Sequence, residues 1–173
     1  MNDILPFTDT KEKGAADFYF CINATFAHIQ RTFAEEGLHR YWEDLGRDWM
    51  SPVWMRWREG GLDAVAEYMR RSFEVEPGAD VIVERHPESV EVEVRTCPAL
   101  AHLRASGRAP IETYCHHCYV VMNAAARCAG LAVRLEGGNG SCRQWFGVAD
   151  GAADQDLMEI RPCVMEADDA GNL

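Results

Sequence analysis

The chain has 173 residues, enough for one domain with a hydrophobic core. Its 28 acidic and 17 basic side chains give a formal net charge of -11. Nucleic acids and anionic membranes both need a basic surface, so this charge argues against binding to either. No stretch approaches the length of a transmembrane helix, and the N-terminus lacks the pattern of a secretory signal. Together with an odd number of cysteines, 7, these features predict reduced thiols and a cytoplasmic location.

The first part of the chain is predicted to be helical from residue 15. Apolar side chains recur there at spacings of three or four residues, which places them on one face of a helix. Gly37 is expected to end or interrupt this helix, and a second, shorter helix is expected to stop near Gly46. The apolar face consists of Phe18, Ile22, Phe26, Ile29 and Phe33.

Two more helices are predicted before the pattern changes. Ser51-Pro52 is a helix start signal, with serine as the cap and proline in the first turn. Gly60-Gly61 is expected to stop this helix, and the next one is expected to end before Pro77-Gly78. Its apolar face consists of Leu62, Val65, Met69 and Phe73.

The second half of the chain is predicted to contain two β-hairpins. Residues 80–97 form the first, around a turn at 86–89, and residues 131–148 form the second, around the glycine-rich segment 136–141. Two helices are expected between them, one starting at Pro98 and stopped by Gly107, the other spanning roughly 113–129 with Gly130 at its end. One more strand is expected within residues 156–165.

This order of elements predicts an α+β fold. N-terminal helices would pack on an antiparallel sheet made of two hairpins, with two helices between the hairpins. We expect a flexible arm at residues 1–13, a single domain at 14–163 and an acidic mobile tail at 164–173.

Four cysteines are predicted to meet at one edge of this sheet. Cys97 ends a strand, Cys142 opens another after a tight turn, and Cys115 and Cys118 share one face of the first turn of a helix. Four thiolates arranged as a tetrahedron are a common zinc site. The sequence therefore predicts zinc bound by these four residues, with His116 or His117 as an alternative ligand in place of one sulfur.

A reactive thiol is the main alternative. Cys115 in the first turn of a helix would feel the positive end of the helix dipole, which favours the thiolate. His117, or else His116, would serve as base and Glu112 would orient it, giving a catalytic set of Cys115, His117 and Glu112. A redox role for the C-x-x-C pair is a third alternative.

The remaining cysteines and the tryptophans are interpreted as structural. Cys21, Cys128 and Cys163 fit apolar faces, so we expect them to be buried. Tryptophans gather between the predicted helices, where they would fill helix junctions; the alternative is that they line an apolar ligand pocket. These are Trp42, Trp49, Trp54 and Trp57.

Residues 81–148 resemble the L-2-amino-thiazoline-4-carboxylic acid hydrolase-like family, and more distantly the vinyl-reductase-type domains that sense small molecules in bacterial regulators. The resemblance rests on "VEVRTC", "YCHHC" and "GNGSCRQWF", and extends to "FAEEGLHRYWEDLG" in the helical half. It implies a helical layer on an antiparallel sheet and a site at Cys97, Cys115, Cys118 and Cys142. The chain departs from the family at Cys118, a position that is often acidic, and at Arg143, where an acidic residue usually follows the last cysteine.

Two functions follow as hypotheses. The first is a zinc-binding cytoplasmic protein that, as the resemblance implies, hydrolyses a non-peptide C–N bond in a small cyclic amidine or thiazoline. The second is a non-enzymatic small-molecule-binding or sensing module in which a cysteine-ligated zinc is structural. Both have a small molecule as partner, with no nucleic acid and no membrane. Assembly into a homodimer stays open.

Overall fold

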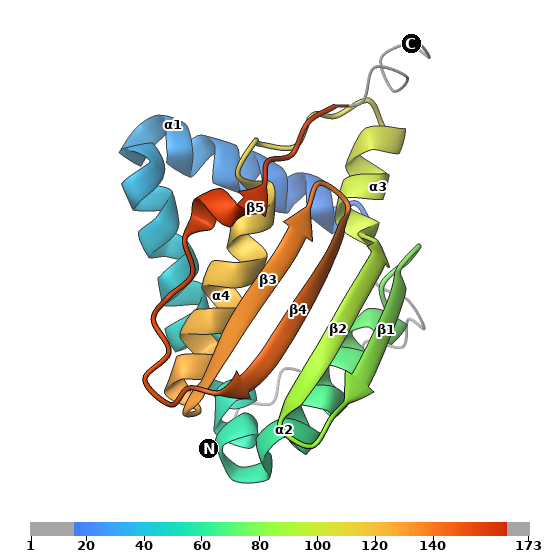
Figure 1. Ribbon diagram of the computed structural model, residues 1–173. Coiled ribbons are helices and arrows are strands. Elements are labelled where there is room, and N and C mark those ends of the chain that lie inside the picture. The colour runs from blue at the N-terminus through green and yellow to red at the C-terminus, as the bar shows by residue number, and fades with distance from the viewer. Residues whose placement is uncertain (1–15, 166–173) are drawn as a thin grey trace, which may run out of the picture.

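A computed structural model describes residues 16–165, which form four α-helices and a five-stranded sheet. The predicted arm at 1–13 and all but the first two residues of the predicted tail lie outside the described residues. The helices cover one face of the sheet (Figure 1), which confirms the predicted α+β class.

The two long helices each contain a break. Helix α1 (Phe18–Asp44) is interrupted at Ala34, whose φ is 58°, and α2 (Ser51–Glu74) is interrupted at Gly61, whose φ is 59°. The predicted start of α2 is confirmed to within one residue, but Ser51 is its first residue and not its cap, because Met50 stands at the N-cap and no side chain caps the helix. The predicted stop at Gly60-Gly61 is found as a break at Gly61. The predicted break at Gly37 is wrong by three residues. A Cβ on Gly37 would collide with the side chain of Phe33. Gly37 is therefore required by the close approach of Phe33 next to the bend, and the bend itself is formed at Ala34.

A short π-helical segment, η1 (Leu45–Trp49), joins α1 to α2. It contains Gly46, so α1 ends two residues before the glycine near which the helix was predicted to stop. Helices α3 (Pro98–Ala105) and α4 (Tyr114–Cys128) lie between the hairpins, as predicted.

The strands run in the order β1-β2-β4-β3-β5. The first hairpin pairs β1 (Asp80–Arg85) with β2 (Ser89–Thr96), and the second pairs β3 (Leu131–Gly138) with β4 (Ser141–Val148). β2 pairs antiparallel with β4 and joins the hairpins into one sheet. The expected extra strand is β5 (Ile160–Arg161), which follows the 3-10 turn η2 (Leu157–Glu159).

The sheet is mixed and not purely antiparallel, which corrects the prediction in one detail. β5 pairs with β3 in parallel. The chain leaves β4 at one end of the sheet, runs back along its edge through residues 149–156 and therefore enters β5 in the direction of β3 (Figure 1). A parallel pair needs a long connection of this kind, and local alternation of residues does not reveal the pairing direction.

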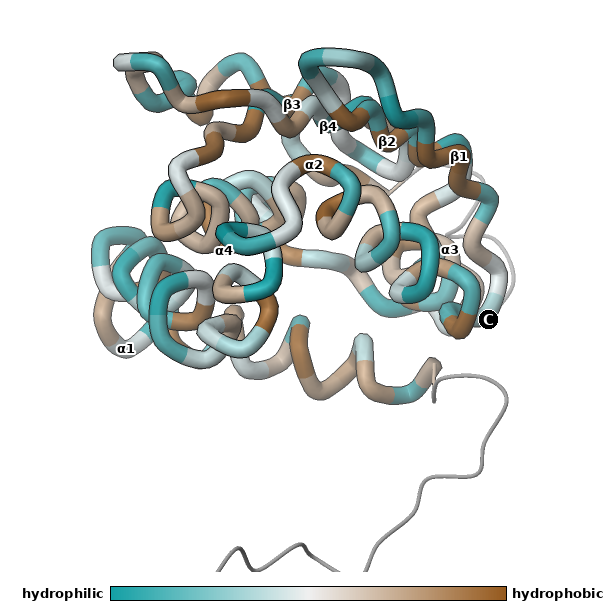
Figure 2. Tube along the Cα trace, turned by 90° about the horizontal axis from the view of Figure 1, so that it is seen from below, coloured by the Kyte–Doolittle hydropathy of each residue, from teal (hydrophilic) through white to brown (hydrophobic). Residues whose placement is uncertain are grey.

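The elements form three layers, seen end-on in Figure 2: the sheet, then α2 and α4, then α1. Val90, Val92 and Val94 of β2 face the helices and are buried, whereas the alternating Glu91 and Glu93 point to the open face. The indoles of Trp42 and Trp57 are buried, the first against Phe26 of α1 and the second against Phe146 of β4. The prediction that the tryptophans fill helix junctions is wrong for Trp49, which is 76% exposed. Within residues 16–165, no helix is both long and apolar enough to cross a membrane.

Candidate functional site

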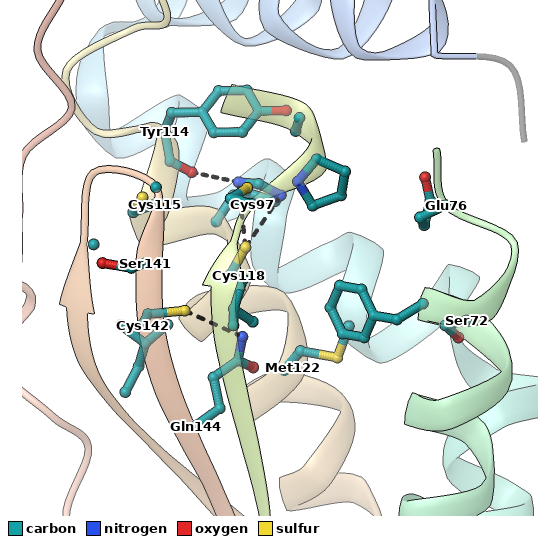
Figure 3. Close-up of a pocket in the computed structure, with 18 of the residues that line it drawn as sticks. Ser72, Glu76, Cys97, Tyr114, Cys115, Cys118, Met122, Ser141, Cys142 and Gln144 are labelled. Atoms are coloured by element: carbon teal, nitrogen blue, oxygen red, sulfur yellow. Dashed lines mark hydrogen bonds between the residues drawn. The ribbon is translucent and has the colours of Figure 1, made fainter. Parts of the chain in front are cut away.

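Cys97, Cys115, Cys118 and Cys142 all line one cavity of about 260 Å³. Figure 3 shows them arranged around one space, with Cys97 after β2, Cys115 and Cys118 on α4, and Cys142 on β4. The register explains the meeting, because Val94 near the end of β2 pairs with Cys142 at the start of β4. The structure thus brings together the four cysteines that the sequence predicted as zinc ligands.

Several N–H groups point at these sulfurs. Cys97 is the N-cap of α3; burial raises the pKa of its thiol, and the nearby backbone N–H groups of Leu100 and Ala99 oppose this effect in part. The backbone N–H of Asn139, in the tight turn between β3 and β4, lies 3.3 Å from Cys115 Sγ. Such donors stabilise a thiolate, and they accompany the thiolate ligands of protein-bound metals.

Burial has the opposite and larger effect on these thiols. It is the main cause that raises the pKa of Cys97, Cys118 and Cys142, that of Cys142 to about 12. The other sulfurs add to the effect at Cys118, because a thiolate there would be repelled by negative charge on Cys97, Cys115 and Cys142. The cluster is therefore neutral near pH 7 unless a cation compensates the charge.

His117 lies beside the cluster as a neutral imidazole. Burial lowers its pKa to about 4. Its Nδ1 bonds the backbone carbonyl of Tyr114, and because a carbonyl only accepts, we assign the hydrogen to Nδ1. Nε2 then carries the free lone pair, 3.7 Å from Cys118 Sγ. His116 is buried on another side of the helix, where the charges nearest to it belong to Glu35, His39 and Glu112.

The structure does not assemble the predicted catalytic set as a chain of contacts. The sulfur that His117 contacts is that of Cys118, whereas Cys115 Sγ lies 3.3 Å from Cys163 Sγ. The side chain of Glu112 is exposed, and its charge acts on His116 and not on His117.

The three cysteines interpreted as core differ from one another. Cys163 is buried, as expected, and Cys128 is half-buried, but Cys21 is exposed, so that prediction is wrong for Cys21. Tyr19 and Phe26, seven residues apart, mark the buried side of this part of α1, and Cys21 lies on the opposite side of the helix. Phe18 and Phe33 are likewise 64% and 65% exposed. The contact between Cys163 and Cys115 had no signal in the sequence spacing.

The rest of the cavity is apolar, with few polar groups. Gln144 of β4 lines it and is only 4% exposed. Glu76, just after α2, also lines it and accepts a hydrogen bond from the Tyr19 hydroxyl, whose pKa is raised by burial and by this carboxylate. None of the tryptophans lines the cavity. The apolar lining includes Ile22, Met69, Phe73, Val94, Met122 and Leu135.

Within residues 16–165, no three His, Cys, Asp or Glu side chains already stand in the geometry of a metal site. The fit to zinc is therefore one of donor chemistry: soft sulfur donors from three elements, N–H groups facing the sulfurs and a neutral imidazole. Compared with models of known protein families and with curated protein sequences, the chain matches none.

Proposed function

We propose that the protein is a small-molecule-binding module in which Cys97, Cys115, Cys118 and Cys142 hold a zinc ion beside an apolar ligand cavity. The observation that carries the proposal is that these four cysteines, from three separate parts of the chain, line the same cavity. Zinc, when bound, would fix the ends of β2, β4 and α4 to one another as a structural cross-link.

The electrostatics of the cluster support a cation. The four thiols are half-buried and have raised pKa values, so they are not stable as isolated thiolates. A divalent cation compensates the mutual repulsion of the thiolates and promotes release of their protons. His117 is the alternative fourth ligand, because its Nε2 lone pair lies beside Cys118. All seven cysteines are free, which fits a reducing compartment, and we extend the proposal to a cytoplasmic location.

Hydrolysis of a non-peptide C–N bond is the second candidate. The observation in its favour is His117, a neutral base next to the cavity. Two observations favour binding without chemistry. The raised pKa values of the thiols disfavour a cysteine nucleophile. Zinc with four sulfur ligands also has no open position for water. The resemblance to aminothiazoline-carboxylate hydrolases belongs to this second candidate.

Metal content tests the zinc part of the proposal. Protein purified without added metal should contain about one zinc per chain by elemental analysis. Replacing Cys97, Cys118 or Cys142 by serine should remove most of it, while the matched control Cys128→Ser, on the same helix as Cys118 but away from the cavity, should keep it. Thermal unfolding of each variant checks that it is folded. Metal-free protein with four cavity cysteines that react freely with a thiol reagent would contradict the proposal.

Ligand binding and catalysis need separate experiments. Indole is a suitable binding probe by isothermal titration calorimetry, because it is small and mostly apolar. Ser72→Phe, which adds a ring to the cavity wall, should abolish its binding without changing the zinc content. For the second candidate, zinc-loaded protein is incubated with 2-aminothiazoline-4-carboxylate. Ring opening above the buffer rate, lost in His117→Gln, would favour the hydrolase.

A further inference from the structure

Among the described residues that line the cavity, Gln144 carries a buried hydrogen-bond acceptor without a partner. The side chain of Gln144 is 4% exposed and lines the cavity, and its Oε1 is buried with no hydrogen-bond partner in the structure. Buried polar atoms in native proteins are nearly always paired, and an unpaired one costs free energy. A ligand bound in the cavity is therefore a candidate hydrogen-bond donor to Gln144 Oε1.

The nitrogen end of the amide faces a sulfur. Nε2 of Gln144 lies 3.9 Å from Cys142 Sγ and donates towards it. A thiolate bound to zinc can only accept hydrogen bonds, so the NH2 group of Gln144 donates towards the sulfur of Cys142. The carbonyl oxygen of the amide is then available to a ligand in the cavity. Figure 3 shows this arrangement, with the nitrogen of Gln144 towards Cys142 and the oxygen turned away from it, towards Met122. This step rests on the proposed zinc site.

The size and charge of the cavity restrict the ligand further. About 260 Å³ is below the range of roughly 300–1,000 Å³ of pockets for drug-sized ligands, so the cavity suits a molecule of one or two rings. Among the described residues that line it, the charged side chain is Glu76, and no lysine or arginine is present. A negatively charged group would therefore enter an apolar space without a cationic partner.

From these observations we infer that the ligand is a small, mostly apolar molecule without negative charge that carries an N–H or O–H donor, and that Gln144 recognises this donor. The inference deepens the proposed binding function by naming the class of ligand and the residue that selects it. Gln144 acts here as a specificity residue: the apolar walls supply most of the binding, and the amide oxygen discriminates between molecules of equal shape.

Three bicyclic probes of nearly equal size separate the donor from the shape. Indole carries an N–H, benzofuran carries an oxygen acceptor at the same position, and indene has a CH2 group there. Each is titrated by calorimetry into the zinc-loaded full chain. We expect indole to bind at least about fivefold more tightly than indene or benzofuran, because only indole pairs the buried oxygen. Gln144→Leu should remove this preference while indene still binds, and the same replacement at Gln30 on α1, outside the cavity, should leave it unchanged.

The outcomes that overturn the inference differ from those that overturn the proposed function. Equal affinity of the wild-type protein for indole and indene, or a preference for benzofuran, would refute the role of Gln144 and leave ligand binding intact. If folded Gln144→Leu still binds indole more tightly than indene, the role of Gln144 is also refuted, and ligand binding is again left intact. Failure of all three probes to bind zinc-loaded wild-type protein would overturn both. The comparison of probes on the wild-type protein needs no variant, so it decides the matter even where Gln144→Leu does not fold.

Discussion

The Sγ atoms of Cys115 and Cys163 lie 3.3 Å apart, although 48 residues separate them in the chain. The backbone places them there. The N–H of Cys163 donates to the carbonyl of Glu112 at 2.8 Å, so the segment after β5 lies along the N-terminal end of α4. Arg104 of α3 holds the same segment by donating to the carbonyl of Val164. A fifth sulfur thus contacts one of the four cysteines of the proposed zinc site.

This contact predicts a selective disulfide. With hydrogen peroxide as oxidant, the two thiols lose one hydrogen atom each, a bond forms between their sulfurs, and peroxide is reduced to two molecules of water. Peptide mapping of oxidised metal-free protein should find Cys115 joined to Cys163. Cys163→Ser should prevent the link, and Cys128→Ser should not. Zinc loading should slow the reaction, because it engages Cys115. A different pair, or equal rates with and without zinc, would contradict this prediction.

Local signals predicted most of the fold, and non-local contacts account for what they missed. The Ser51-Pro52 pair and Gly61 mark the start and the break of α2 through their own backbone preferences, although Ser51 is the first residue of the helix and not its cap. The bend at Ala34 has no such signal, because alanine favours helix and the bend depends on packing around the neighbouring residues. The parallel pairing of β5 depends equally on the path of the chain and not on its own residues.

Gly46 lies where the backbone of η1 meets α4. A Cβ at this position would lie 2.7 Å from the Cβ of Ala124 and would also collide with the carbonyl of Val121. Gly46→Ala should therefore lower the free energy of unfolding by about 2–3 kcal/mol, as expected for overpacking at a site that cannot relax. Chemical denaturation measures this loss.

Gly147→Ala is the matched control for Gly46. Its Cβ would meet the carbonyl oxygen of Glu88 at 3.6 Å, an ordinary van der Waals distance. The change in stability should stay within about 0.5 kcal/mol. Equal effects of the two substitutions would show that the close approach of η1 to α4 is not what requires glycine.

The charge of the cavity predicts how a carboxylate affects binding. Indole-5-carboxylate should bind the zinc-loaded protein at least about tenfold more weakly than indole, because its anion would be desolvated near Glu76 without a cationic partner. Glu76→Gln keeps an acceptor for the Tyr19 hydroxyl and should recover part of the loss. Glu74→Gln, at the same end of α2 but outside the cavity lining, should recover none. Tighter binding of the carboxylate would refute this picture of the cavity.

The candidate site was predictable to the extent that it depends on residue type and spacing. Cysteines at strand ends and in a first helical turn are visible in the sequence, and the four that were predicted line one cavity. Gln144 and Glu76 gave no such signal, since an isolated glutamine in a strand and a glutamate after a helix are ordinary surface choices. Their role arises from the cavity that the helices close over the sheet.

Asp154 predicts a dependence of stability on pH away from the cavity. Its Oδ1 accepts hydrogen bonds from Asn123 at 2.9 Å and Arg127 at 3.0 Å, which tie the 149–156 connection to α4 and lower the pKa of the carboxyl group. A lowered folded-state pKa means that the ionised form stabilises the fold above the unfolded pKa of about 3.9, and that this contribution is lost as pH falls through the folded value.

Because the side chain is 73% exposed, Asp154→Asn should cost only about 0.5 kcal/mol at pH 7. Urea denaturation should show this difference shrinking below about pH 4, and Asp150→Asn, at an exposed aspartate of the same connection, is the matched control. A difference that persists in acid would assign the effect of Asp154→Asn to altered packing and not to the carboxylate charge.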